Sequence, residues 1–181
     1  VLVTVATSTS QVTSTTTPVT NFYVGSYFAV TENTSSRNVT SITIKENGTV
    51  DGETGLDNIR LRYDLDTSSP YNCVSESYSA SDTAFGTTDT DGFSGPNGTS
   101  TFTGSVTIST TSTMCLYVVV DSTSLASNGE TIDIVMESPS SNLIVTGGGS
   151  VSPSVTRDMN GSTTLVGPVV TQTHYHWRSD N

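Results

Sequence analysis

The stretch Met114-Cys-Leu-Tyr-Val-Val-Val120 carries an apolar side chain at every position. Successive residues of a strand point to opposite faces, so this stretch is apolar on both faces and is predicted to be a central strand of a sheet. The stretch Asn58-Ile-Arg-Leu-Arg-Tyr-Asp-Leu65 alternates instead. Its apolar set, predicted to point inward, is Ile59, Leu61, Tyr63 and Leu65.

Further strand-like stretches lie on either side of these two, and helical periodicity is almost absent. Only 122–128, closed by Gly129, is compatible with a short helical turn. Short strands separated by Gly, Asn and Asp turns predict an all-β fold, a two-layer antiparallel β-sandwich of jelly-roll or immunoglobulin-like type. One core is expected, over residues 19–168, followed by a C-terminal tail at 169–181. The other predicted strands are 22–30, 39–45, 102–108, 131–136, 143–146, 150–155 and 163–166.

The first residues form a strand-like apolar segment that a polar, Thr-rich tract separates from the rest of the chain. Val1, Val3 and Val5 share one face, while Leu2, Thr4 and Ala6 share the other. We expect residues 1–18 to be a donor strand with its linker, pairing with the open edge of a neighbouring subunit. Two alternatives remain open: the segment pairs within its own sheet, or it is the stub of a secretion signal.

The composition is acidic and rich in hydroxyl groups. Ser and Thr total 63 of 181 residues, and 6 Lys and Arg stand against 17 Asp and Glu, for a net charge of −11. This charge repels a phosphate backbone and an anionic membrane surface, and it attracts divalent cations. No apolar run approaches the ~20 residues of a membrane-spanning helix. Nucleic acid and a membrane span are therefore not expected.

Glycosylation sequons and the two cysteines favour a secreted, extracellular glycoprotein. Cys73 and Cys115 are the only cysteines, and one disulfide between them fits an oxidising compartment, with two buried thiols as the alternative. Five N-x-S/T sequons occur, at Asn33, Asn38, Asn47, Asn97 and Asn160.

Three acidic segments are candidates for calcium, which takes several oxygen ligands at ~2.3–2.6 Å. The first holds Asp89 and Asp91 before Gly92, with Asp82 upstream. The second, 51–57, holds Asp51 and Glu53. The third is formed by Asp64 and Asp66 where a strand ends. The alternative for each is a solvated polar turn, since no complete EF-hand pattern is present.

Catalysis has little support in the sequence, and we expect no enzyme. No Ser lies in a Gly-x-Ser-x-Gly elbow, and both His residues fall in the tail. His174 and His176 are more typical of a surface pair than of a metal site, because only two ligands are visible. A glycosidase carboxylate pair is not excluded by composition, but nothing singles one out.

Four stretches together resemble the cannula proteins, secreted subunits of the extracellular tubules of hyperthermophilic archaea. They are Thr17-Pro-Val-Thr-Asn-Phe-Tyr-Val-Gly-Ser-Tyr-Phe-Ala-Val30, 58–65, Thr113-Met-Cys-Leu-Tyr-Val-Val-Val-Asp121 and Gly147-Gly-Gly-Ser-Val-Ser-Pro153. The resemblance implies a β-sandwich, calcium-driven assembly into hollow tubes and strand exchange between subunits. It also implies calcium in the loops of Asp51, Glu53, Asp89 and Asp91.

The expected function is therefore a structural subunit that self-assembles with calcium, by donor-strand exchange, into an extracellular tube or filament. Its main partner would be itself, in a helical homopolymer. The alternative is a calcium-dependent carbohydrate-binding module with glycans as its partner. It predicts an exposed aromatic face, for which the candidates are Phe22, Tyr23, Tyr27 and Phe28. A hydrolase domain ranks third.

Overall fold

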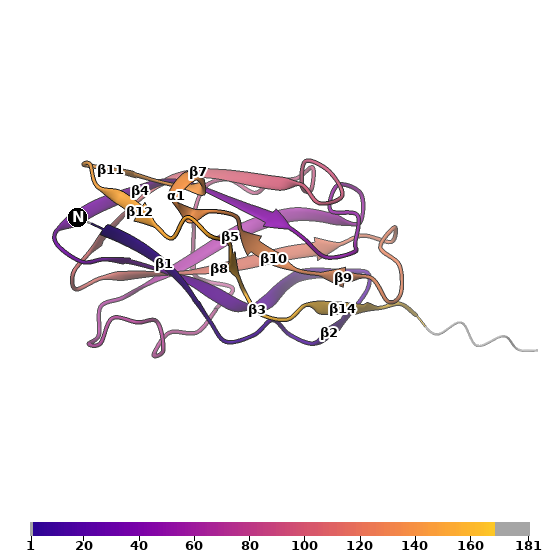
Figure 1. Cartoon of the computed structure of the whole chain (residues 1–181). Helices are drawn as coiled ribbons and strands as arrows, with labels where there is room; N and C mark the ends of the chain where they lie inside the picture. The colour runs from indigo at the N-terminus through magenta and orange to yellow at the C-terminus, as the bar shows by residue number, and fades with distance from the viewer. Residues whose placement is uncertain (1, 169–181) are drawn as a thin grey trace, which may run out of the picture.

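A computed structural model of the chain describes residues 2–168 (Figure 1). Val1, the predicted tail, His174 and His176 lie outside the described residues. Among the described residues, the regular elements are all strands apart from one short helix, which confirms the predicted all-β class. The strands are β1 (Leu2–Ser8), β2 (Ser14–Thr16), β3 (Val19–Glu32), β4 (Ser36–Glu46), β5 (Leu56–Asp66), β6 (Thr83–Ala84), β7 (Thr99–Ser109), β8 (Thr113–Ser122), β9 (Thr131–Ile132), β10 (Ile134–Met136), β11 (Leu143–Thr146), β12 (Ser150–Ser152), β13 (Arg157–Asp158) and β14 (Thr163–Val166).

One layer of the sandwich is a six-stranded sheet in the order β12-β1-β3-β8-β5-β6. Its central strand is β8, which pairs antiparallel with β3 on one side and β5 on the other. Every residue of β8 is buried. This result confirms the central strand that the apolar run at 114–120 predicts.

The opposite layer is built around β4, which pairs with β7 along its length and with β11 and β10 on its other side. A smaller sheet, β2-β14-β9, extends this arrangement at the end of the molecule where the described chain stops (Figure 1). Most pairings are antiparallel, but β1 with β12 and β2 with β14 are parallel. The two parallel pairs differ from the antiparallel sandwich that the sequence predicts.

The main core lies between the two layers, and Phe28, Ile42, Leu61 and Leu116 are among its fully buried side chains. Leu65 was predicted to point inward with Leu61 but is 39% exposed. The short helix expected at 122–128 is absent from that segment, which forms turns. The helix α1 lies instead at Pro139–Asn142, where Pro139 supplies a favourable first helical residue.

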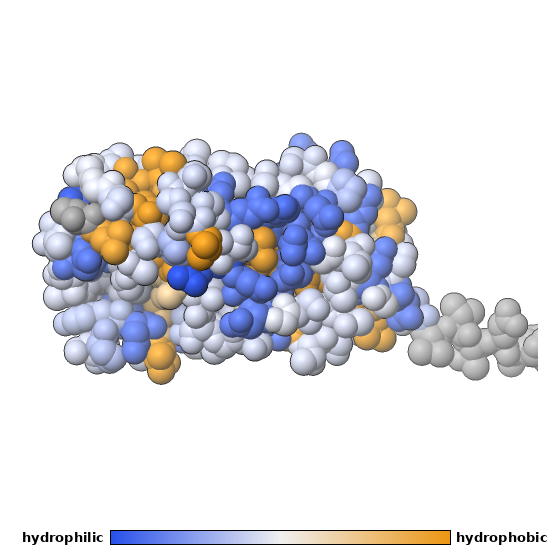
Figure 2. Space-filling model, viewed as in Figure 1, coloured by the Kyte–Doolittle hydropathy of each residue, from blue (hydrophilic) through white to orange (hydrophobic). Residues whose placement is uncertain are grey.

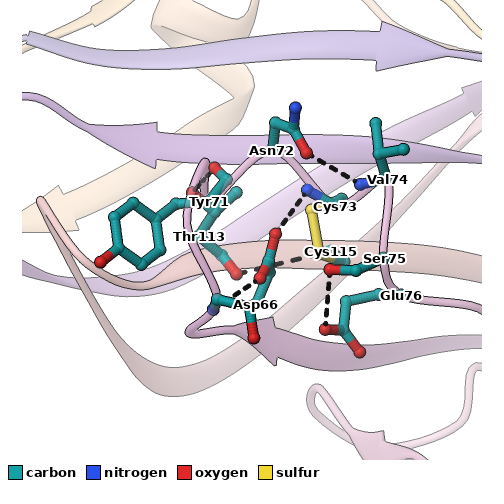
Figure 3. Close-up of a disulfide and its surroundings, with 10 residues drawn as sticks. Asp66, Tyr71, Asn72, Cys73, Val74, Ser75, Glu76, Thr113 and Cys115 are labelled. Carbon is teal, nitrogen blue, oxygen red and sulfur yellow. Dashed lines mark hydrogen bonds between the residues drawn. A yellow bond between two sulfur atoms is a disulfide. The ribbon is translucent and has the colours of Figure 1, made fainter.

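A second apolar cluster covers the outer face of the six-stranded sheet. Cys73 forms a disulfide with Cys115 of β8, as predicted, and ties the loop between β5 and β6 onto that face (Figure 3). The cluster contains Tyr27, Ala29, Cys73, Cys115 and Tyr117, with Tyr23 and Tyr78 packed against it. This cover explains why β8 needs apolar side chains on both faces.

The N-terminal segment is not detached from the body in the single chain. Strand β1 pairs antiparallel with β3, with Val5 opposite Val30, and parallel with β12. Val3 and Val5 are 1% and 0% exposed. In the single chain residues 2–8 therefore lie within the sandwich, as the alternative of pairing within its own sheet describes, and donation of this strand to a neighbouring subunit stays a prediction. The physical reason is that the two valines complete a core that would otherwise face water.

Candidate functional site

Two of the acidic loops predicted from the sequence pack against each other. The backbone N–H of Gly52 donates to the carbonyl of Pro96 at 3.1 Å, and the N–H of Phe93 donates to the carbonyl of Gly52 at 2.9 Å. Gly92 has φ +75°, and a β-carbon there would lie 2.6, 2.8 and 2.9 Å from the carbonyl oxygens of Leu56, Gly52 and Glu53. Only glycine fits, so the loops approach closely because residue 92 has no side chain.

The junction of the two loops forms an acidic hollow that we call the loop hollow. It is lined by Glu53, Thr54, Leu56, Asp57, Thr90, Asp91 and Thr123. Its carboxylates come from both loops. An all-oxygen donor set of this kind matches the chemistry of calcium. Asp57 belongs to this group, although the sequence analysis singled out only Asp51 and Glu53 from its loop.

Asp51 and Asp89 serve the backbone of their own loops. The carboxylate of Asp51 accepts from the N–H groups of Glu53 at 3.0 Å and Thr54 at 3.3 Å. Asp89 accepts from the N–H of Asp91 at 3.3 Å and from the hydroxyl of Ser100. Both therefore shape the loops that hold Glu53 and Asp91, as Asp side chains commonly do in turns.

Asp66 is buried and fully engaged in structure. Its carboxylate accepts from the N–H groups of Ser68 and Cys73, both at 2.9 Å (Figure 3). Burial alone would raise the pKa of Asp66, but these hydrogen bonds outweigh it and lower the pKa below its usual range. We therefore interpret Asp66 as an anchor of the disulfide loop.

Asp82 lies beside Asp64, although the sequence analysis placed it with Asp89 and Asp91. The pairing of β5 with β6 brings the two carboxyls together, and the Asp82 side chain also accepts from the N–H of Ser79 at 2.7 Å. Across residues 2–168, no group of three or more His, Cys, Asp or Glu side chains is arranged to hold a metal ion. Calcium binding thus remains a prediction.

The strand β1 fills a slot between β3 and β12, and a short hinge joins it to the body. After β1, Thr9 has φ +65°, a left-handed conformation that is costly for a β-branched residue. The chain is fixed again from Gln11, whose N–H donates to the carbonyl of Asn160 at 3.0 Å. The Gln11 side chain donates to the carbonyl of Gly161 at 2.7 Å. Thr9 and Ser10 link these two segments, and Thr9 is itself held to the body: its carbonyl accepts from the side-chain amide of Asn160 at 3.2 Å, and its hydroxyl donates to that of Ser26 at 3.5 Å.

An apolar surface lies beside the β1 slot. Figure 2 shows apolar side chains gathered at the end of the molecule where Figure 1 places β11 and β12. A shallow groove there is lined by Leu143, Ile144, Val145 and Val151, with Ser140, Gly149 and Ser150. Ile144 is 48% exposed. Exposed apolar patches of this kind are typical of contact surfaces.

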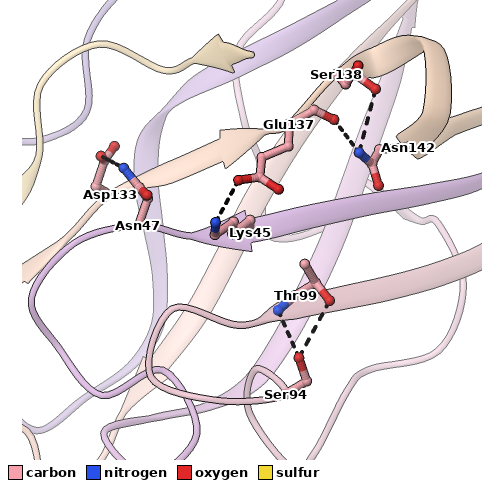
Figure 4. A network of polar contacts seen from close by, with 8 residues as sticks. All are labelled: Lys45, Asn47, Ser94, Thr99, Asp133, Glu137, Ser138 and Asn142. Carbon is pink, nitrogen blue, oxygen red and sulfur yellow. Dashed lines mark hydrogen bonds and ion pairs between the residues drawn. The ribbon is translucent and has the colours of Figure 1, made fainter. Parts of the chain in front are cut away.

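The glycosylation sequons fall into two groups. The side chains of Asn33, Asn47, Asn97 and Asn160 are exposed, and Asn38 is half-buried within β4. The amide nitrogen of Asn47 donates to Asp133 at 3.3 Å (Figure 4). A glycan is attached through that nitrogen, so glycosylation at Asn47 would compete with this contact.

The aromatic face that a carbohydrate-binding module needs is not formed by the four candidate residues. Phe28 is buried at 0% exposure and Tyr27 at 7%. Tyr23 stacks on Tyr78 of the disulfide loop with ring centroids 4.6 Å apart, and Phe22 packs against the main core. These side chains stabilise the fold and do not present a flat binding platform.

The chain has no match among known protein families, curated proteins or solved structures. No helix within residues 2–168 is long and apolar enough to cross a membrane.

Proposed function

We propose that this chain is a structural subunit that self-assembles outside the cell into a tube or filament by exchanging β1 between copies. The observation that supports the proposal best is the β1 slot with its two-residue hinge. A strand that lies between β3 and β12 makes the same ladder bonds and buries the same valines whichever copy supplies it.

The energy balance of such an exchange is close. Burying Val3 and Val5 contributes about 3–5 kcal/mol in either arrangement, so this term cancels. What differs is the hinge, where extending Thr9 would relieve a strain of about 1–2 kcal/mol. Against this gain stands the loss of the hydrogen bonds that Thr9 makes with Asn160 and Ser26. A head-to-tail exchange of this kind need not close on itself, and it can therefore propagate.

Charge opposes the assembly, and calcium would favour it. Each subunit carries a net charge of −11, and neighbouring copies repel one another within the ~8 Å Debye length of physiological salt. Calcium bound at the loop hollow would neutralise part of this charge through Glu53, Asp57 and Asp91. The apolar surface around Ile144 would then be covered by the next subunit.

Secretion and kinship with the cannula proteins are parts of the same proposal. The Cys73–Cys115 disulfide and the exposed sequons suit an oxidising, extracellular setting. The sequence resemblance supplies the expected form of the product, a hollow tubule.

Negative-stain electron microscopy of the purified chain, before and after adding millimolar calcium, tests the proposal. We expect filaments only with calcium. A chain that lacks residues 1–8 should stay unassembled, because it has a slot and no strand to donate.

A synthetic peptide of residues 1–8 provides the control. It should stabilise the truncated chain by filling the slot, yet produce no filaments, since it links no two copies. A peptide that carries Val3→Asp and Val5→Asp should do neither. Filaments from the truncated chain alone would contradict strand exchange.

A further inference from the structure

The apolar surface around Ile144 contains a groove of a size that suits one side chain. Ile144, Val145 and Val151 form its apolar walls, and none of the described residues that line it carries a charge. Ile144 is 48% exposed, and Val145 and Val151 are half-buried, so this apolar area faces water in the single chain. Its volume of about 270 Å³ lies below the roughly 300–1,000 Å³ of small-molecule sites. The groove therefore suits an anchoring side chain of a protein partner better than a separate ligand.

The groove lies at one end of the molecule, and the described chain stops at the other. Figure 1 shows β11 and β12 beside the N-terminus, whereas β14 lies at the opposite end. In the strand direction, three positions along β9 and β10, five along β4 and two along β14 separate Val166 from Ile144. At about 3.3 Å per residue this is a span of about 33 Å. Two copies placed end to end would therefore bring the end of β14 in one copy close to the groove of the next.

The sequence that follows β14 has the composition of a docking segment. It reads Val169-Val-Thr-Gln-Thr-His-Tyr-His-Trp177, lies outside the described residues, and is called the tail segment below. Its β-branched and aromatic residues favour extended chain, and at period two Tyr175 and Trp177 share one face. It holds no Asp, Glu, Lys or Arg, in a chain with a net charge of −11. An uncharged segment can approach an uncharged groove of another copy without the repulsion between the acidic surfaces.

The tail segment reaches a neighbouring copy more readily than the groove of its own copy. From Pro168 to Trp177 the chain spans about 30 Å when fully extended. Even if the chain reversed directly after Pro168, Trp177 would fall short of Ile144 in the same copy, which is about 33 Å from Val166 along the strands. In an end-to-end row, the groove of the next copy adjoins the end of β14. The favoured occupant is therefore the tail segment of a second copy.

We propose that the tail segment of one copy docks in the groove around Ile144 of the next copy, with Trp177 as its anchor. Trp is enriched among the residues that carry most of the energy of protein interfaces, because its large side chain leaves water as a whole. Docking would cover Ile144, Val145 and Val151 at the same time.

This contact rests on the proposed self-assembly for its partner, and it names the segment that covers the apolar surface around Ile144. It requires neither the exchange of β1 nor calcium. Docking is measured with a peptide on unassembled chain in chelator, whereas filaments are scored by microscopy with calcium. Peptide binding without filaments would support the tail contact and contradict the proposed function. Filaments without peptide binding would do the reverse.

Tryptophan fluorescence tests the contact, because Trp177 is the only Trp of the chain. A synthetic peptide of residues 169–178 is titrated, in chelator, into the full chain carrying Trp177→Ala, so that the peptide supplies the only indole signal. We expect a saturable blue shift of its emission as the indole leaves water. An unlabelled peptide carrying Trp177→Ala should compete at least about thirtyfold more weakly than the unchanged peptide.

Two variants of the acceptor chain locate the binding surface. Ile144→Asp should weaken peptide binding at least about tenfold, because it places a charge in the apolar groove. Val74→Asp is the matched control and should leave binding unchanged, since Val74 is 74% exposed and does not line the groove. Circular dichroism verifies that both variants are folded. If Ile144→Asp fails to fold, the competition with the Trp177→Ala peptide decides, because that peptide needs no fold.

The unmodified full chain distinguishes a second copy from the chain's own body. In chelator, the emission of Trp177 should shift to the blue as the protein concentration rises, since docking joins two copies. A blue shift that does not depend on concentration would assign the tail segment to its own copy and overturn the proposal. Titration without any shift, or equal competition by the Trp177→Ala peptide, would overturn it as well.

Discussion

The buried carboxyl of Glu46 should make the stability of the protein fall as pH rises. Glu46 is 0% exposed. One carboxylate oxygen accepts from the N–H groups of Gly48 at 2.7 Å and Asp133 at 3.0 Å, while the other has no partner. Burial raises the pKa of Glu46 from 4.5 to about 7, and the charge of Asp133 adds to the rise. The folded chain therefore keeps a proton that the unfolded chain releases.

The size of the effect follows from the pKa difference. Between pH 4.5 and about 7 the unfolded state loses the Glu46 proton first, so the free energy of unfolding decreases with rising pH in this window. One pKa unit corresponds to about 1.4 kcal/mol, so the full change is about 3 kcal/mol. Below pH 4.5 both states are protonated and the stability from this group is fully present.

Glu46→Gln removes the titration and keeps an oxygen for Gly48 and Asp133. Urea unfolding at pH 4 and pH 8 gives the free energy of unfolding of both proteins. From pH 4 to pH 8, that of the wild type should fall by about 3 kcal/mol relative to that of the variant. Comparing the variant with the wild type cancels the other titrating groups. Glu137→Gln is the control, because Glu137 is half exposed and pairs with Lys45 at 2.6 Å (Figure 4). A pH-independent difference between Glu46→Gln and wild type would refute the reasoning.

Two further predictions concern stability. Val5→Ala should lower the free energy of unfolding, measured with urea, by about 2–3 kcal/mol, because Val5 is buried in the core. Thr4→Ala, on the opposite face of β1, should lower it by less than about 1 kcal/mol. Equal effects of the two substitutions would place β1 outside the core. Replacing Cys73 and Cys115 together by Ala should lower the free energy of unfolding in urea by about 4 kcal/mol, because the disulfide joins residues 42 positions apart. A variant as stable as the wild type would show that other contacts hold the loop.

The strands could be predicted because their signals are local. The alternation at 58–65 and the apolar run at 114–120 report directly which faces are buried, and both correspond to strands β5 and β8. The segments 143–146 and 163–166 coincide with β11 and β14. The disulfide was also foreseen, since two cysteines allow only one pairing.

Pairings between distant segments could not be predicted in this way. The parallel contact of β1 with β12 joins residues about 148 positions apart, and no local pattern encodes it. For the same reason, the sequence did not predict which acidic residues lie close together in the fold. Asp82 was grouped with Asp89 by sequence distance, but the ladder between β5 and β6 sets it beside Asp64.

The hydrogen bonding of buried polar residues could not be predicted from the sequence either. Neither Glu46, which precedes Asn47 and Gly48, nor Tyr117, which lies within the apolar run 114–120, was singled out from the sequence. Their missing hydrogen-bond partners become visible only when the surrounding side chains are placed. The one available signal at Tyr117 was its hydroxyl group within an otherwise apolar run, which requires a polar partner when buried.

Covalent trapping of β1 tests strand exchange most directly. Ala6 and Ala29 are directly opposite each other in the pairing of β1 with β3, at a spacing that a disulfide can bridge. The double variant Ala6→Cys, Ala29→Cys is oxidised after calcium addition and run on a non-reducing denaturing gel, with chelator-treated protein as the control. Strand exchange predicts a ladder of covalent multimers with calcium and a single monomer band with chelator. A monomer band alone from calcium-assembled filaments would contradict it.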